Sequence, residues 1–169
     1  IPFGYILKPF QDKDLEVTIE MALYVAKVDA ERKQAEEALR ESEDRYRSLF
    51  KNNHSVVLVI DPKNGDIVDA NPASCSFYGW SLEELTAKKI TDIDMLTEEQ
   101  VFQEMEKAKS EQRRHFIFRH RLSNGDIRDV EVYSGPIQLH GQKLLYSIIH
   151  DITDRKIVEE ALQESEERF

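Results

Sequence analysis

The chain has 169 residues, 40% of them hydrophobic, and a formal net charge of −10. This length predicts one domain with extensions, and the apolar content excludes wholesale disorder. The acidic balance argues against a nucleic-acid-binding surface. The single cysteine excludes an internal disulfide and a multi-cysteine zinc site. No segment reaches the roughly 18 apolar residues of a membrane helix and no signal-peptide pattern begins the chain, so we expect a cytoplasmic location.

Residues 14–50 contain no proline or glycine, which predicts one long helix. Apolar residues recur along it with alternating spacings of four and three, a pattern typical of a heptad seam. The residues of this dimer seam are Met21, Val25, Val28, Ala35, Leu39 and Tyr46. Arg32 and Ser42 occupy two further seam positions and weaken the pattern. We predict a modest parallel homodimer; the alternative is a helix that packs on its own domain.

An internal repeat is the clearest feature of the organisation. Residues 32–46 (RKQAEEALRESEDRY) and 155–169 (RKIVEEALQESEERF) agree at ten of fifteen positions and begin 123 residues apart. Shared composition alone would not place these residues in register. The repeat therefore predicts one period of a longer array, whose next copy begins at the C-terminal end. The alternative is two unrelated helices of similar composition.

Two strands and three short helices are predicted after the long helix. The strands at 55–61 and 66–71 flank the turn Pro-Lys-Asn-Gly, in which Asn and Gly accept positive φ. The first helix begins where Asn71 precedes a proline, which suits an N-cap followed by proline at the first helical position. Ser81 and Thr97 each begin a capping-box pattern, which predicts the second and third helices.

Three further strands are predicted at 115–122, 127–134 and 143–152. This order predicts an α+β fold: a five-stranded antiparallel sheet with short helices on one face, flanked by the long N-terminal helix and a C-terminal helix. Alternation along the strands places apolar residues on both faces of the sheet. The second face therefore needs a cover, either the flanking helix or a partner subunit.

An ordered set of motifs resembles a PAS domain of the sensory-box type over about residues 45–155. The motifs are Asp-Pro at 61–62 with Gly65, IVDAN at 67–71, FYGWSLEEL at 77–85, Asn-Gly at 124–125 and DITDRK at 151–156. One departure is Ala87, where many relatives have glycine. The resemblance implies a PAS fold for residues 49–153, after a helical linker and candidate coiled coil at 29–48. It also implies that residues 154–169 form the outgoing helix and the start of a further PAS unit.

The N-terminal segment has a second resemblance. GYILKPF at 4–10, followed by an amphipathic helix, resembles the last strand and helix of a response-regulator receiver domain, so residues 1–28 are interpreted as its C-terminal remnant. In that family the lysine contacts a phosphorylated aspartate and the following proline is often preceded by a cis peptide, roles that would fall to Lys8 and Pro9. The earlier strands with the phosphoacceptor are absent. The alternative is an ordinary strand-to-helix connection.

PAS domains commonly bind a small molecule between the sheet and the helices, so the resemblance implies a pocket. The candidate pocket residues are Cys75, Tyr78, Trp80, Met95, Phe102, Met105, Phe116 and Phe118. The cofactor stays unknown. Covalent flavin is disfavoured because the cysteine lies on the first short helix rather than in the family's Asn-Cys-Arg-type motif. Haem is disfavoured because the third helix has no histidine, and the five histidines have no spacing that would build a metal site.

The connection between the last strand and the outgoing helix is the candidate signal-transmitting linker. It comprises Asp151, Thr153 and Arg155. In similar PAS proteins the aspartate pairs with a downstream basic residue, here Arg155, and so couples the sheet to the helix. The alternative is simple helix capping without a signalling role.

The resemblance implies a sensory and dimerisation module in cytoplasmic signal transduction. We expect it to relay binding of a ligand or partner through its flanking helices to neighbouring receiver, PAS and output domains. The expected parent is a hybrid histidine kinase or related phosphorelay protein of a two-component system. This fragment has no catalytic constellation, so it is not expected to be an enzyme, while the parent's activity stays open. The alternative is a ligand-free structural module that only dimerises and spaces other domains.

Overall fold

The computed structural model describes residues 12–168, which belong to two compact units divided after Arg47. In the first unit, α1 (Asp12–Tyr46) is one uninterrupted helix, as the absence of proline and glycine predicts. No side chain of α1 is buried, and all six dimer-seam residues are exposed in the single chain. The predicted dimer therefore stays a prediction. A π-helical turn, η1 (Arg47–Lys51), lies at the boundary of the two units, where the prediction extended the α-helix to residue 50.

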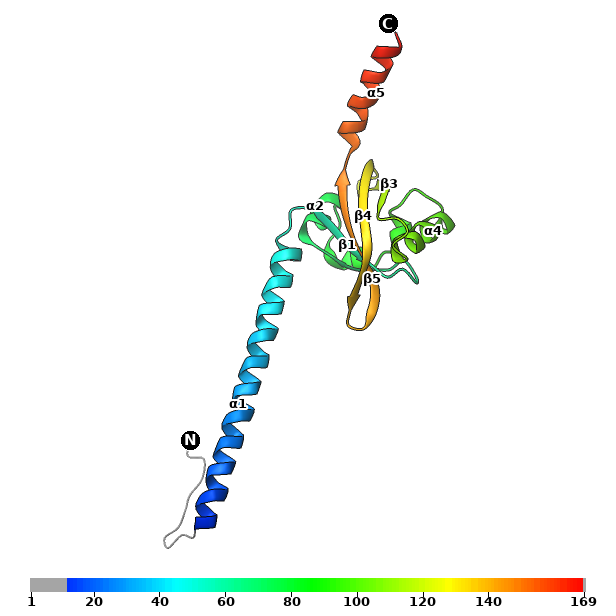
Figure 1. Ribbon diagram of the computed structural model, residues 1–169. Coiled ribbons are helices and arrows are strands. Elements are labelled where there is room, and N and C mark those ends of the chain that lie inside the picture. Colours follow the sequence, from blue (N-terminus) through cyan, green and yellow to red (C-terminus); the bar gives the residue numbers. More distant parts are fainter. Residues whose placement is uncertain (1–11, 169) are drawn as a thin grey trace. The chain divides into compact units, whose positions relative to one another are not determined.

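The second unit contains the predicted five-stranded antiparallel sheet (Figure 1). Its strands, in the spatial order β2-β1-β5-β4-β3, are β1 (Val56–Ile60), β2 (Ile67–Ala70), β3 (His115–Arg121), β4 (Ile127–Leu139) and β5 (Gln142–Asp151). The hairpin β1-β2 and the meander β3-β4-β5 join where β1 pairs with β5. The central strand β5 therefore connects both halves of the sheet to the outgoing helix.

Strand β4 extends beyond its predicted end at residue 134. Its pairing with β5 continues from Ser134 through Pro136 to Leu139. Its pairing with β3 stops at Tyr133, so beyond that residue one edge of β4 has no neighbouring strand within residues 12–168. A proline without an N–H group is tolerated at such an edge. Gly-Pro at 135–136 therefore does not end the strand, although these two residue types taken alone predict that a strand ends there.

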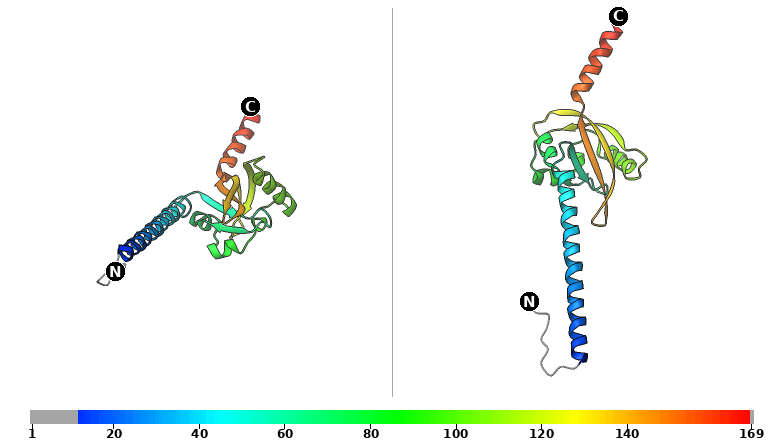
Figure 2. Two further views of the ribbon diagram at one scale, coloured as in Figure 1. Left: turned by 60° about the horizontal axis from the view of Figure 1, so that its bottom comes forward. Right: turned by 60° about the vertical axis from the view of Figure 1, so that its left-hand side comes forward.

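Between β2 and β3 lie α2 (Pro72–Tyr78), α3 (Leu82–Thr86), the 3₁₀ turn η2 (Ile90–Asp92) and α4 (Glu98–Lys109). All three predicted caps are confirmed. The Asn71 side chain accepts from the Ser74 amide, and Ser81 and Thr97 form complete capping boxes. Turn η2 was not predicted, because three residues carry too little periodicity to detect. Figure 2 shows this segment folded against the sheet.

The two faces of the sheet are covered differently. The inner face packs against the helices and forms the main core, in which Tyr78, Leu85 and Met105 meet Phe116 and Val130. The outer face has a smaller cluster of Phe50, Val57, Val59 and Leu144. Farther along this face, Ile117 and Tyr133 are 42% and 45% exposed. The sequence thus predicts apolar residues on both faces correctly, and Phe50 of η1 covers only part of the outer one.

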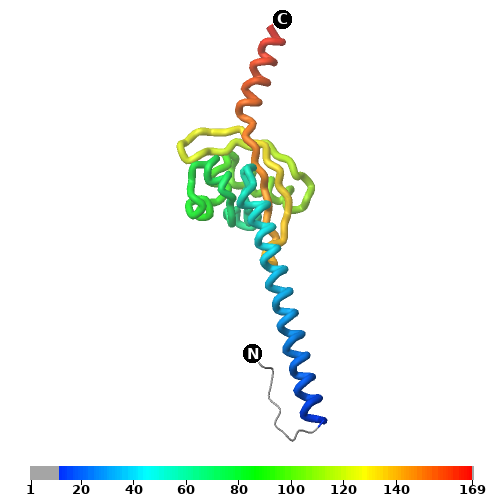
Figure 3. Tube along the Cα trace, turned by 90° about the vertical axis from the view of Figure 1, so that its left-hand side faces the viewer, coloured from blue at the N-terminus to red at the C-terminus, as the bar shows by residue number. Residues whose placement is uncertain are grey.

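Helix α5 (Thr153–Glu167) directly follows β5 and projects from the sheet (Figure 3). None of its side chains is buried. Its first turns contact β4, and its remaining length carries the acidic repeat sequence. Within residues 12–168, no helix is both long and apolar enough to cross a membrane.

Candidate functional site

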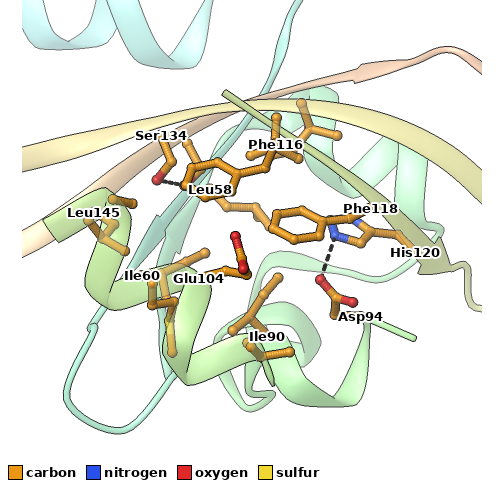
Figure 4. A pocket seen from close by; sticks show the side chains of 16 residues that line it. Leu58, Ile60, Ile90, Asp94, Glu104, Phe116, Phe118, His120, Ser134 and Leu145 are labelled. Carbon is orange, nitrogen blue, oxygen red and sulfur yellow. Dashed lines mark hydrogen bonds and ion pairs between the residues drawn. The ribbon is translucent and has the colours of Figure 1, made fainter. Parts of the chain in front are cut away.

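A cavity of about 40 Å³ lies between the inner face of the sheet and the helical segment (Figure 4). Its apolar lining consists of Leu58, Ile60, Ile90, Val101, Met105, Ala108, Phe116, Phe118, Val132, Leu145 and Ile149. Its polar lining consists of Asp94, Glu104, His120, Ser134 and Ser147. The volume admits a few waters or one very small molecule, since a water needs about 10–15 Å³ of such space. It is far smaller than the roughly 300–1,000 Å³ of a drug-sized ligand site.

A buried polar chain runs along one wall of the cavity. The Tyr78 hydroxyl lies 2.8 Å from His120 Nδ1, and His120 Nε2 lies 3.6 Å from Asp94 Oδ2. The side chains of His120 and Asp94 are each 2% exposed. Burial, with a smaller contribution from the Asp94 charge, raises the pKa of Tyr78 well above its ordinary value. The phenol therefore keeps its proton. The direction of its bond to Nδ1 depends on the His120 tautomer, and we assign the phenol as the donor, which places a ring hydrogen on Nε2 beside the Asp94 carboxylate.

This arrangement leaves one buried donor unsatisfied. His120 Nε2 has no hydrogen-bond partner among the described residues, because 3.6 Å from Asp94 is too long for a hydrogen bond. Asp94 Oδ1 instead accepts from the Leu96 amide at 2.9 Å. An unsatisfied buried donor costs about 1–3 kcal/mol and calls for an explanation such as a water or ligand. Figure 4 shows His120 and Asp94 on the same side of the cavity.

Two serines form a second polar contact. Ser134 of β4 and Ser147 of β5 are direct cross-strand partners, and their hydroxyl oxygens lie 2.8 Å apart. Both residues are buried and line the cavity. Since each hydroxyl has one hydrogen and two lone pairs, the pair retains capacity to bond a third group.

The structure brings some of the predicted pocket residues to the cavity. Met105, Phe116 and Phe118 line it, and Tyr78 joins it through His120. Three others pack against the main core outside the lining: Cys75, Trp80 and Phe102. Burial raises the pKa of the Cys75 thiol, the opposite of the shift that activates a reactive cysteine. Met95 is 38% exposed and contacts Arg121, so it lies outside the cavity as well.

Sequence reasoning missed His120, Asp94 and the serine pair. For His120 the signal was available, because alternation places it on the same face of β3 as Phe116 and Phe118. Asp94 carries no such signal, since it follows the unpredicted turn η2. Its position depends on a tertiary pairing in which the segment around Asp94 bridges to His120 on the edge strand.

The linker contacts differ from the predicted ones. Asp151 Oδ1 accepts from the Thr153 amide at 2.9 Å and from the Thr153 hydroxyl at 2.6 Å. Asp151 Oδ2 lies 3.7 Å from Arg128 of β4. Arg155 instead lies 3.6 Å from Glu131 of β4, so the structure corrects the predicted pairing of Asp151 with Arg155. A transmission role for the linker stays a prediction.

Helix α5 is held to β4 by a second set of contacts. Lys156 Nζ donates to Asp129 Oδ1 at 2.9 Å. The Thr153 hydroxyl accepts from the Asp129 amide at 3.0 Å. Asp129 therefore fixes the first turn of α5 through both its backbone and its side chain.

Two further predictions concern the receiver-like segment and metal binding. The receiver-like Lys8 and Pro9 lie outside the described residues. Among the residues that the structure describes, no cluster of three or more metal-binding side chains occurs.

Comparison with known proteins gives one consistent result. Residues 53–154 match the family model described as PAS domain. Diguanylate cyclase DgcM of Escherichia coli is 38% identical over 127 residues, which are 73% of this chain and 31% of the cyclase. The methyl sulfide methyltransferase-associated sensor of Methanosarcina acetivorans is 31% identical over 154 residues, 89% of this chain and 15% of the sensor. The chain thus spans less than a third of either relative.

Solved structures show the same fold. The PAS domain of an HTR-like protein from Haloarcula marismortui is similar with a TM-score of 0.63 and 26% identity, covering 71% of this chain and 99% of that domain. The family match leaves the receiver-like segment and the whole repeat copy at 155–169 outside its limits. Their assignment to a receiver domain and a further PAS unit stays a prediction.

Proposed function

The chain belongs to the PAS domain family, and from this premise we propose that it relays binding of a very small molecule in its cavity to adjacent modules. The observation that carries the proposal is the buried Nε2 of His120, which lines the cavity and has no hydrogen-bond partner among the described residues. A ligand that accepts this hydrogen bond would satisfy the donor.

The lining favours a small, neutral molecule with a hydrogen-bond acceptor. The carboxylates of Asp94 and Glu104 line the same cavity and would repel an anion. The aliphatic and aromatic walls favour a ligand with some apolar surface. A short amide, a short alcohol or an ordered water has the required size and polarity.

The residues present do not fit covalent flavin or haem. The one cysteine of the chain, Cys75, lies on α2 outside the cavity lining. His120 is the only histidine among the lining residues, and its Nε2 faces the Asp94 carboxylate at 3.6 Å rather than a space that could hold haem. Both groups are also much larger than the cavity. No step of the proposed relay therefore depends on either group.

Native mass spectrometry and ring NMR test the proposal. Native spectra of freshly purified protein detect a co-purified molecule at stoichiometric occupancy. Titration with formamide as probe, followed by ¹H–¹⁵N spectra of the imidazoles, is expected to shift the His120 signal saturably and to move amide signals of α5. The exposed His140 is the internal control and should not respond.

Absence of both a co-purified molecule and a saturable His120 response would overturn ligand sensing. That outcome would support the alternative function, a ligand-free module that dimerises and spaces other domains. The small cavity is the specific observation that favours this alternative. The exposed apolar seam of α1 and the open part of the outer sheet face support dimerisation in either case.

We further propose that the parent protein is a cytoplasmic signalling enzyme with an output domain beyond α5. Its relatives include a diguanylate cyclase as well as a sensor, so a cyclase output stands beside the histidine kinase predicted from the receiver-like segment. Assays of the full-length parent with GTP and with ATP distinguish cyclic dinucleotide synthesis from autophosphorylation. If neither product forms, the proposal of an enzymatic parent is contradicted.

A further inference from the structure

Glu131 lies on β4 at the point where the sheet meets α5. Its side chain is 16% exposed, whereas its two partners His115 and Arg155 are about half exposed. His115 begins β3, and Arg155 lies in the first turn of α5. One carboxylate therefore contacts both a strand of the cavity wall and the outgoing helix.

Both partners approach the same oxygen atom. His115 Nε2 lies 2.9 Å from Glu131 Oε1, a hydrogen-bond distance, whereas Arg155 Nη2 lies 3.6 Å from it. The hydrogen bond from His115 is also the main reason why the pKa of Glu131 is lowered, ahead of the charge of Arg155. In the observed arrangement the carboxylate is thus engaged with β3, and α5 is held by a longer ion pair.

The two contacts are unequal, since only His115 lies within hydrogen-bond distance of the shared oxygen. A small rotation of the Glu131 carboxylate towards Arg155 would give a charge-assisted hydrogen bond and lengthen the bond to His115. By contrast, the side chain of Asp129 bonds Lys156 of α5, and its backbone amide donates to the Thr153 hydroxyl. Asp129 therefore acts as a fixed attachment for the helix, while Glu131 has two alternative partners.

We infer that Glu131 is a switchable contact, whose Oε1 binds either His115 of β3 or Arg155 of α5 and so sets how firmly α5 is held to the sheet. The next residues on the inner side of β3 are Phe116, Phe118 and His120, which line the cavity. A displacement of this wall would move His115 and change its bond to Glu131. Only this last step depends on the proposed sensory function; the competition itself does not.

Distance measurements between two spin labels test the competition directly. One label is placed at Lys143, at the exposed beginning of β5, and the other at Glu166, near the end of α5. The native cysteine is removed by C75S, and the protein carries no added ligand. The distance distribution then gives the populations of held and displaced α5.

Three variants distinguish competition between His115 and Arg155 for Glu131 from a role of His115 in supporting the contact between Glu131 and α5. Glu131→Gln removes the charge and is expected to raise the displaced population roughly threefold, the factor for a partly exposed ion pair. His115→Phe keeps a ring against Tyr133 but removes the donor, so Arg155 gains the carboxylate and the displaced population should fall. Glu159→Gln is the matched control, because Glu159 is Arg155's intrahelical partner at 3.7 Å. It should not raise the displaced population, because Arg155 keeps Glu131 as its partner.

Two results would overturn the inference. Equal effects of Glu131→Gln and Glu159→Gln would mean that Glu131 has no special role in holding α5. An increase in the displaced population in His115→Phe would mean that His115 supports the contact rather than competing for it. Because these measurements use ligand-free protein, they are independent of the formamide titration. A failed titration with a confirmed competition would reject ligand sensing alone.

Discussion

The inner and outer faces of the sheet differ in what covers them. The inner face is closed by the helical segment, and buried polar side chains from the sheet and this segment line one small cavity between them. The outer face has a small cluster under Phe50, but Ile117, Tyr133 and the carboxylate of Glu131 remain near solvent. Packing density makes the inner face sensitive to volume changes, while exposed groups can exchange partners at little cost. Stability and communication are therefore expected to depend on opposite faces.

Two adjacent residues of β3 are expected to show the largest difference in stability between the two faces. Phe116 is 2% exposed and stacks on Phe118 in the cavity wall, whereas Ile117 is 42% exposed on the outer face. Phe116→Ala should lower the free energy of unfolding by about 3–5 kcal/mol because it leaves a cavity in a close-packed core. Ile117→Ala should cost less than about 1 kcal/mol. Urea unfolding measures both, and similar losses would mean that the outer face is also buried, for example in a dimer.

A pair of tyrosines tests the polar chain of the inner face. Tyr78→Phe removes the donor to His120 Nδ1 and should destabilise the protein by about 1–2 kcal/mol, because a buried acceptor loses its partner. Tyr133→Phe, at 45% exposure, is the matched control and should be near neutral. The imidazole nitrogen shifts of His120 provide a second measurement. If the ring hydrogen already resides on Nδ1 in the unaltered protein, the proposed direction of the Tyr78 bond is wrong.

The apolar seam of α1 is a second surface that the single chain leaves uncovered. Leu39→Glu places a charge in the predicted seam and should weaken dimerisation by roughly tenfold or more. Leu23→Glu makes the same change at an exposed leucine outside the seam and should have little effect. Light scattering over a concentration series compares the two. A monomer at every concentration in the unaltered protein would remove the dimer altogether.

The smallest expected effect concerns acid stability at the outer face. The hydrogen bond from His115, followed by the nearby Arg155, lowers the pKa of Glu131 from its ordinary value of 4.5. A lowered folded-state pKa stabilises the fold above the ordinary value, and this contribution is lost as pH falls through the lowered one. Glu131→Gln should therefore be less stable than the unaltered protein at pH 7. The difference should shrink in urea titrations carried out at increasingly acidic pH, and a constant difference would contradict the shifted pKa.

Local signals predicted much of the fold correctly. The caps at Asn71, Ser81 and Thr97 depend on hydrogen bonds within three residues, so the sequence alone contains both partners. Alternation likewise predicts Phe116 and Ile117 on opposite faces of the sheet, and the structure shows which of them is buried. The same pattern contained His120, but a lone histidine among phenylalanines is not conspicuous without its partners.

Non-local contacts account for the rest. The extension of β4 through Pro136 could be predicted only if the end of the neighbouring strand β3 were already known. The pairing of Asp151 with Arg128 rather than Arg155 depends on how β4 and β5 align across the sheet. Strand register is set by the packing of a whole face of the sheet. The short separation of Asp151 and Arg155 along the chain therefore did not identify Arg128 as the cation nearest to Asp151.

By itself, the sequence determined the presence and order of the five α-helices and five strands and the family resemblance, because each depends on periodicity, capping or motifs within a short stretch of chain. Only the tertiary structure decided that Tyr78, His120 and Asp94 form a buried polar chain with an unsatisfied donor. It alone placed Glu131 between His115 and Arg155. These residues come from segments far apart in the sequence, and their distances follow from how the sheet, the helical segment and α5 pack together.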